Sequence, residues 1–247
     1  MSSLPAVIAV VAASGGLGAS TLAVAVGRRL AAIGPPSVVV DLDLTGGGLD
    51  VTAGVEHLPG QRWPAFAGVQ GPVPTESLLA SLPREDGCGI LSAGGPGPRA
   101  VPASAVSDVL AALVAGSEGP VVLDVPRRSP HLPAAVASAH LVLVLVGLRT
   151  RALADADACV EAVVDLVDGS TDLRAVTRGP RPTAALLDDV EAHLGVAHLH
   201  HLEDDPAVVR TAERGLWPGV ARDAVRRAAD AALSALPGSG GHVGRAS

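Results

Sequence analysis

The chain has 247 residues, 48% of them apolar, and a formal net charge of -7 with a pI near 5.5. That length suits one large α/β domain, and the acidic balance without a basic stripe argues against a protein that coats nucleic acid. Two cysteines far apart in sequence argue against a disulfide or zinc scaffold, and no apolar run approaches the roughly 18 residues that span a bilayer.

The first predicted elements are an apolar strand over 7–12, a glycine-rich loop over 13–21 and an amphipathic helix that reaches Ile33. Such junctions bind phosphate, because glycines let successive N–H groups turn inward and the helix adds the positive end of its dipole. In the phosphate-loop pattern G-x-x-x-x-G-K-S/T, Ala13 replaces the first glycine and Ala19 replaces the lysine. The residues expected to contact phosphate are Gly15, Gly16, Leu17, Gly18, Ala19, Ser20 and Thr21.

The second predicted strand, over 37–43, is rich in valine and ends in two acids, Asp41 and Asp43. Open parallel sheets bind ligands at the carboxyl ends of their strands, so we expect these carboxylates beside the glycine loop. The alternative is that either acid only caps the glycine-rich turn over 45–50.

Residues 55–74 are predicted to be mostly loop, and they contain Trp63 and Phe66. An exposed aromatic pair would mark a partner surface, but in a chain with 1% aromatic residues we favour a plug at one end of the core. A short helix over 75–82, a strand over 88–92 and an amphipathic helix through 106–114 follow.

The next predicted strand, over 120–126, is an apolar run that contains Asp124 near its end. This is the form of a Walker B strand, whose carboxylate reaches Mg²⁺ through water beside the phosphates. The chain contains no lysine, and all 18 of its basic residues are arginines. Arg127 and Arg128 are therefore the nearest candidates for a replacement cation, although a solvated charge pair is the favoured interpretation.

The remaining elements alternate, with strands predicted over 140–147, 173–179 and 196–202 and helices over 153–167 and 184–194. In the last of these strands His198 and His200 would share a face, a spacing that can bind metal. We do not favour a metal site there, since no carboxylate or thiolate partner is evident.

The last predicted helix ends near Leu236 and is rich in alanine with little bulky apolar surface. It would bind lipid weakly, so packing on the sheet is the favoured interpretation. The tail over 237–247 is rich in Gly and Ser and is predicted to be disordered. We expect a cytoplasmic protein with at most peripheral association with the inner face of the membrane.

The glycine loop resembles the deviant phosphate loop of the ParA/MinD family, which reads K-G-G-x-G-K-S/T. The matching residues are Gly15, Gly16, Gly18 and Ser20. Ser14 and Ala19 replace the two lysines, which in the family contact phosphates of the same or the partner subunit. The resemblance implies an α/β fold, with a mostly parallel, doubly wound sheet flanked by helices, in a single domain over 1–236.

The same resemblance implies ATP or ADP with Mg²⁺ as ligands and a homodimer, but with both family lysines replaced we expect the nucleotide to bind weakly or not at all. Ser20, Asp41 and Asp124 would hold Mg²⁺ at the phosphates. Asp41 would also orient the attacking water, which makes it the expected catalytic residue.

The nucleotide base is expected near the end of the strand over 173–179. In ParA/MinD relatives this strand commonly ends in an Asn that reads adenine, whereas this chain contains no Asn and offers Arg178. Arg178 would stack on the base or close the loop. Asp205 and Pro206 match a loop that borders the base in the family.

A nearer likeness is to the CpaE/TadZ group, including actinobacterial septum-site-determining proteins. It is carried by the lysine-free loop, the acidic segment from Asp41 to Asp50, Arg62-Trp63, and Arg178-Gly179-Pro180. Relatives often carry a receiver-like N-terminal domain, which we do not expect here. The likeness implies a protein that positions a septum or a Tad-type pilus or secretion machine, with components of those machines as partners.

We expect hydrolysis to be impaired, because losing one preorganised cationic group typically costs about 3 to 4 kcal/mol, or on the order of 10² to 10³ in rate. One alternative is an active ATPase with an arginine in place of the lysine. A second is a structural adaptor that binds no nucleotide. A dinucleotide-dependent oxidoreductase is disfavoured, because Thr21 occupies the third glycine position of G-x-G-x-x-G.

Overall fold

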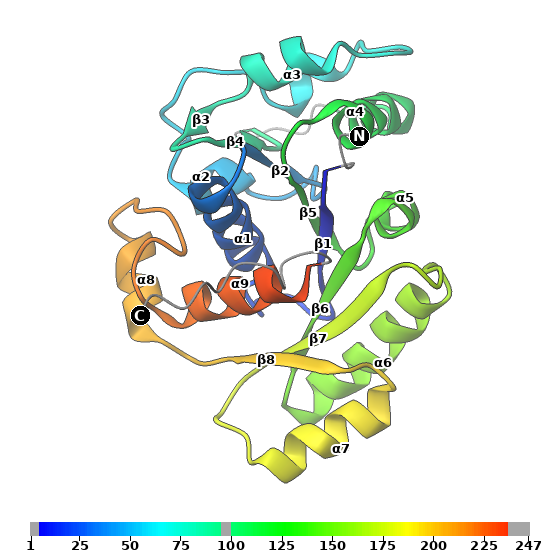
Figure 1. Ribbon diagram of the computed structural model, residues 1–247, viewed down its shortest axis with the longest axis vertical. Coiled ribbons are helices and arrows are strands. Elements are labelled where there is room, and N and C mark those ends of the chain that lie inside the picture. The colour runs from blue at the N-terminus through cyan, green and yellow to red at the C-terminus, as the bar shows by residue number, and fades with distance from the viewer. Residues whose placement is uncertain (1–4, 95–99, 237–247) are drawn as a thin grey trace, which may run out of the picture.

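The computed structural model describes residues 5–94 and 100–236, and the predicted disordered tail lies outside them. An eight-stranded sheet in the order β3-β4-β2-β5-β1-β6-β7-β8 runs through this part of the chain (Figure 1). The strands are β1 (Val7–Ala12), β2 (Ser37–Asp41), β3 (Arg84–Glu85), β4 (Cys88–Leu91), β5 (Val121–Pro126), β6 (Leu141–Gly147), β7 (Asp172–Arg178) and β8 (His198–Leu202). Only the short edge strand β3 pairs antiparallel among them, with β4. The predicted mostly parallel sheet is confirmed.

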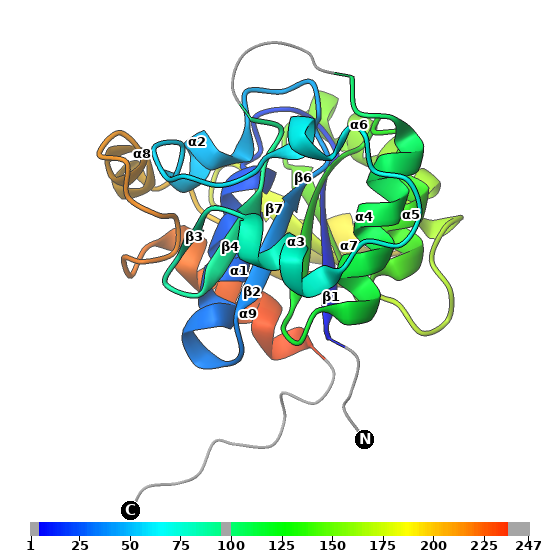
Figure 2. The same ribbon diagram turned by 90° about the horizontal axis from the view of Figure 1, so that it is seen from above.

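Helices cover both faces of the sheet, as Figure 2 shows from above. One face carries α1 (Ala19–Ile33), α2 (Leu49–Ala53), α8 (Pro206–Ala212) and α9 (Ala224–Ala235). The other face carries α3 (Thr75–Ser81), α4 (Ala103–Gly116), α5 (Leu132–Ser138), α6 (Thr150–Val164) and α7 (Ala184–Leu194). A 3₁₀ turn, η1 (Trp63–Phe66), lies on this second face. The architecture is therefore doubly wound.

The central strands are buried on both faces, which explains their nearly continuous apolar sequences. Alternate residues of β1 divide between the two cores: Val7 and Ala9 pack with α4 and α5, while Ile8 and Val10 pack with α1 and α9. Because β1 is central, the loop that follows it lies at the middle of the carboxyl edge of the sheet.

Two packing predictions are confirmed. Trp63 and Phe66 are buried and meet edge to face with ring centroids 6.4 Å apart, so they plug the core. Helix α9 buries Val225, Ala228 and Ala232 against the α1 side of the sheet. No helix in the described ranges is long and apolar enough to cross a membrane.

The predicted histidine pair is wrong. A register shift between β7 and β8 leaves Ala175 opposite His198 but Val176 opposite His200. The hydroxyl of Thr177 consequently contacts His198 Nε2 and His201 Nδ1, each at 3.0 Å, so His201 rather than His200 lies beside His198. A strict period of two fails wherever a bulge adds a residue.

Candidate functional site

The glycine loop is open toward its ligand side. Gly16 and Gly18 have φ values of +79° and +88°, which L side chains rarely adopt, and a Cβ added to Gly15 or Gly16 would meet nothing within 4 Å. Gly18 is the N-cap of α1, and this 15-residue helix has neither a side-chain cap nor an acid in its first turn. The loop thus forms a backbone cradle at an uncapped helix N-terminus, which suits an anion.

A cleft of about 510 Å³ lies against this cradle. The glycine loop from Ser14 to Thr21 lines one side, and Asp43, Asp124 and the segment Val125–Arg128 line the rest. The residues predicted to bind phosphate are therefore gathered at one cleft, together with Asp124 of β5, the strand predicted to be a Walker B strand.

Asp124 lies in β5 directly opposite Asp41 of β2. The pKa of Asp124 is raised to about 7, mainly by burial and also by the neighbouring charges of Asp41 and Asp43, while a hydrogen bond from the Ser20 hydroxyl opposes the shift. The carboxyl group is thus poorly solvated as an anion and would be stabilised by a cation. Oxygen donors from Ser20 and Asp124 are the kind that Mg²⁺ prefers.

Asp41 is engaged differently from the prediction, which gave it the roles of orienting water and holding Mg²⁺. Its carboxylate accepts backbone N–H bonds from Asp43 (2.9 Å), Leu49 (3.0 Å) and Ala93 (3.1 Å) and is almost fully buried. Burial raises its pKa to about 6 despite these bonds. Asp41 therefore holds together the loop that follows β2, although it also borders a smaller hollow that contains Ser20 and Asp124.

Asp43 was expected beside the glycine loop together with Asp41, but the sequence interpretation gave the catalytic and Mg²⁺-binding roles to Asp41 alone. It lines both the main cleft and the smaller hollow. Its position two residues beyond Asp41, outside the buried strand, was the feature of the sequence that could have indicated its access to a ligand. Of the two acids, Asp43 has the freer access to a ligand at the phosphate loop.

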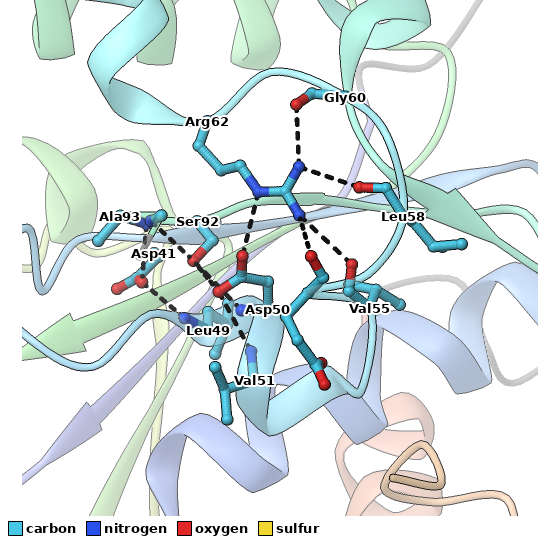
Figure 3. Close-up of polar contacts among 12 residues, drawn as sticks. Asp41, Leu49, Asp50, Val51, Val55, Leu58, Gly60, Arg62, Ser92 and Ala93 are labelled. Carbon is cyan, nitrogen blue, oxygen red and sulfur yellow. Dashed lines mark hydrogen bonds and ion pairs between the residues drawn. The ribbon is translucent and has the colours of Figure 1, made fainter. Parts of the chain in front are cut away.

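A buried clamp fixes the segment between β2 and η1 (Figure 3). The Arg62 guanidinium donates from Nε to Asp50 Oδ2 at 3.0 Å and from its other nitrogens to four backbone carbonyls, those of Val55, Glu56, Leu58 and Gly60. Ser92 donates to Asp50 Oδ1 at 2.9 Å, and Trp63 Nε1 donates to the Asp41 carbonyl at 2.6 Å. Asp50, Arg62 and Trp63, which carried the nearer resemblance, therefore fix the segment that follows Asp41 and do not themselves line the cleft.

Two of the arginines near the site are engaged in ion pairs. Arg127 donates to Asp155 Oδ1 of α6 at 3.0 Å, and Arg178 lies 2.8 Å from Asp204. Arg128 lines the cleft, is exposed, and has no ion-pair partner within residues 5–94 and 100–236.

A second cavity of about 510 Å³ adjoins the cradle at Gly18 and Thr21. Its wall is mostly apolar, with Arg178, Glu213 and Asp223 as its charged members; the apolar members include Leu202, Val208, Val209, Leu216 and Val225. Of the residues predicted to border the base, Arg178 lines this cavity. Asp205 instead caps α8 and bonds to the Ala224 N–H, and neither Asp205 nor Pro206 lines this cavity.

A metal ion held by protein side chains alone is not supported. In the described part of the chain, no group of three or more His, Cys, Asp or Glu side chains is arranged to hold one. Mg²⁺ commonly uses one or two protein ligands plus phosphate oxygens and water, which the Ser20 and Asp124 pair suits.

The fold defines the class: it is the fold of the ParA and MinD ATPases. The chain superposes on a ParA family ATPase from Chlorobium tepidum with a TM-score of 0.76 at 12% identity, covering 94% of this chain and 98% of that one. It also superposes on MinD from Pyrococcus horikoshii, solved with Mg-ADP, with a TM-score of 0.66 at 16% identity over 92% and 94% of the two chains.

The chain belongs to the family of the Mycobacterium tuberculosis protein Rv3660c, an uncharacterized protein. The two are 36% identical over 248 residues, which cover 98% of this chain and 67% of that protein. No family model matches the chain.

Proposed function

We propose that this protein is a nucleotide-binding positioning protein of the ParA/MinD type, which binds Mg²⁺ and ATP or ADP in the phosphate-loop cleft and hydrolyses ATP slowly or not at all. The observation that carries the proposal is the open cradle of Gly15 to Gly18 at the uncapped start of α1, beside Asp124. The loop N–H groups would bind phosphate oxygens. Bound Mg²⁺ would supply positive charge at the phosphates.

The proposal gives roles to most of the predicted residues but none to Asp205 or Pro206, which do not line the second cavity. Ser20 and Asp124 hold Mg²⁺. Asp41, which was predicted to orient water, instead shapes the adjoining hollow through its backbone hydrogen bonds. Asp43 is better exposed for that second role. Arg178 borders the base cavity, whose apolar wall suits the face of a nucleobase.

Slow hydrolysis follows from the residues in place of lysine. Ser14 and Ala19 line the cleft and carry no charge. Phosphoryl transfer depends mainly on positioning and on stabilising charge, so an uncharged cradle can retain binding while losing rate. The protein would then act through nucleotide occupancy and dimerisation, with a septum or a Tad-type pilus or secretion machine as the structure that it positions.

Titration calorimetry with ATP and ADP in the presence of Mg²⁺ tests binding. We expect saturable heat for the native chain, weaker binding for Ser20→Ala, and native behaviour for Ser107→Ala, which makes the same change on α4. Absence of both heat and thermal stabilisation at millimolar nucleotide would instead favour the adaptor that binds no nucleotide.

Hydrolysis is tested by restoring the lysine. Ala19→Lys should raise the rate of phosphate release by on the order of 10², because the new ammonium group would enter the cleft. Rapid release from the native chain, with no gain in Ala19→Lys, would contradict the proposal and favour an ATPase that already has its cation.

A further inference from the structure

We propose that Arg128 is the cation in the wall of this cleft that binds the polyphosphate of the ligand, outside the glycine loop, whose two lysine positions stay uncharged. This assignment rests on the proposed function, since it names the protein group that recognises the phosphates of the nucleotide. It also goes beyond that function, because the group that Arg128 recognises is a linear polyphosphate, with or without a nucleoside attached.

The charges around the cleft create the need for a cation. Asp43 and Asp124 line it and Asp41 lies next to it, while the glycine loop contributes no charged side chain. A polyphosphate carries several negative charges, so the carboxylates repel it wherever Mg²⁺ does not neutralise them. Backbone N–H groups alone contribute only partial charge.

The arginines around the site differ in what they already bind. Arg62 is enclosed in the Asp50 clamp, Arg127 is paired with Asp155, and Arg178 is paired with Asp204. Arg128 is both in the wall of the phosphate cleft and without an ion-pair partner among the described residues. A ligand would therefore meet its guanidinium without first breaking a protein ion pair.

The backbone presents Arg128 from a fixed turn. Ser129 N–H donates to the Pro126 carbonyl at 2.8 Å, which makes Arg127 and Arg128 the two central residues of a turn. The Ser129 hydroxyl donates to the Leu42 carbonyl at 3.1 Å and so ties the turn to the segment after β2. The Arg127 bond to Asp155 anchors the same turn to α6. Only the Arg128 side chain has to order when a ligand binds, and its planar guanidinium can form paired bonds to phosphate.

The test compares three ligands by calorimetry in Mg²⁺: ATP, inorganic tripolyphosphate and adenosine. Arg128→Gln should weaken binding of ATP and tripolyphosphate at least about tenfold and leave adenosine unchanged, because a charge-assisted bond to phosphate is lost. Arg128→Lys should retain part of the affinity. Arg174→Gln is the matched control, since it makes the same charge change at a residue paired with Asp172 and outside the cleft.

The outcomes separate the two proposals. If ATP binds the native chain and Arg128→Gln binds it as tightly as Arg174→Gln does, the Arg128 assignment is overturned and nucleotide binding stands. If the native chain binds tripolyphosphate but not ATP, the nucleotide proposal fails, and the effect of Arg128→Gln on tripolyphosphate still decides the assignment. Binding of neither ligand overturns both. Circular dichroism of each variant verifies that the exposed substitution leaves the fold intact.

Discussion

Ionisation of the buried Asp124 carboxyl group opposes folding. Its pKa is about 7 in the folded protein against an ordinary value of 3.8, so between these values the folded state holds a proton that the unfolded state has released. Stability therefore falls as pH rises through this window, and above pH 7 the full penalty of burying a charge is present. We expect Asp124→Asn to be more stable than the native chain at pH 8 without Mg²⁺, by at most about 4 kcal/mol.

Urea denaturation between pH 5 and pH 8 measures this effect. The advantage of Asp124→Asn should shrink by roughly 1.4 kcal/mol for each pH unit below 7. Asp168 is the control of opposite sign, because hydrogen bonds from Ser170 lower its pKa, so Asp168→Asn should not stabilise the protein at pH 8. A pH-independent gain in Asp124→Asn would contradict the argument.

The Arg62 clamp makes a second prediction at this scale. The Asp50 side chain is 5% exposed, so Arg62→Gln leaves a buried carboxylate without its ion-pair partner. Breaking such a pair typically costs about 3 to 5 kcal/mol. Arg227→Gln breaks an ion pair that is about half exposed and should cost at most about 1 kcal/mol. Equal losses for the two variants in urea denaturation would show that the clamp contributes no more than a surface pair.

Individual site residues were predictable where a motif fixes the backbone, as at Gly16, Gly18 and Asp124. The different roles of Asp41 and Asp43 were not predictable, since they depend on N–H donors to Asp41 that are as distant in sequence as Ala93. The sequence indicated Arg62 only as one of the residues that carry the resemblance to the CpaE/TadZ group. Its role requires five acceptors that meet only after the loop has folded.

At the scale of elements, one contact joins α2 to the segment before α9. A Cβ added to Gly54, the C-cap of α2, would lie 2.4 Å from the Gly215 carbonyl oxygen. Gly54→Ala should therefore displace the loop that carries Leu216 in the second cavity, as well as impose a side chain at a φ of +73°. We expect a loss of about 2 to 4 kcal/mol in stability.

Gly195 supplies the matched control for Gly54. It is the C-cap of α7 with a φ of +65°, and an added Cβ there would meet nothing within 4 Å. Gly195→Ala should cost only the conformational part, about 1 to 2 kcal/mol. If denaturation gives the two variants the same loss, the contact with Gly215 is unimportant.

Long elements with a clear period were predictable, including β6 over Leu141–Gly147 and α7 over Ala184–Leu194. The sequence interpretation omitted α2, α5 and α8, which have five to seven residues and display little of a period, although it predicted α3, which has seven. It also omitted the two-residue strand β3, which exists through its pairing with β4.

The whole molecule combines two apolar cores on one sheet, and this supports the predicted single domain. All the strands except β3 are flanked by helices packed across the sheet, and both cores contain residues from the same strands, such as Val7 and Ile8 of β1. Neither core can lose its packing without exposing strands that also form the other. The domain should therefore unfold in one cooperative step.

The two tryptophans allow this prediction to be measured, because Trp63 lies in the core on the α4 side and Trp217 in the core on the α1 side. Trp217→Phe leaves Trp63 as the reporter of the first core, and Trp63→Phe leaves Trp217 as the reporter of the second. Each substitution changes stability, since Trp63 donates to the Asp41 carbonyl and Arg28 stacks on Trp217, so the comparison is made within each variant.

In urea, tryptophan fluorescence and far-UV circular dichroism should give one midpoint for each variant, and the two variants should have equal m-values because the surface exposed on unfolding is the same. A fluorescence midpoint that departs from the circular dichroism midpoint in either variant would mean that one face of the sheet loses its core first, and that the chain unfolds as two units.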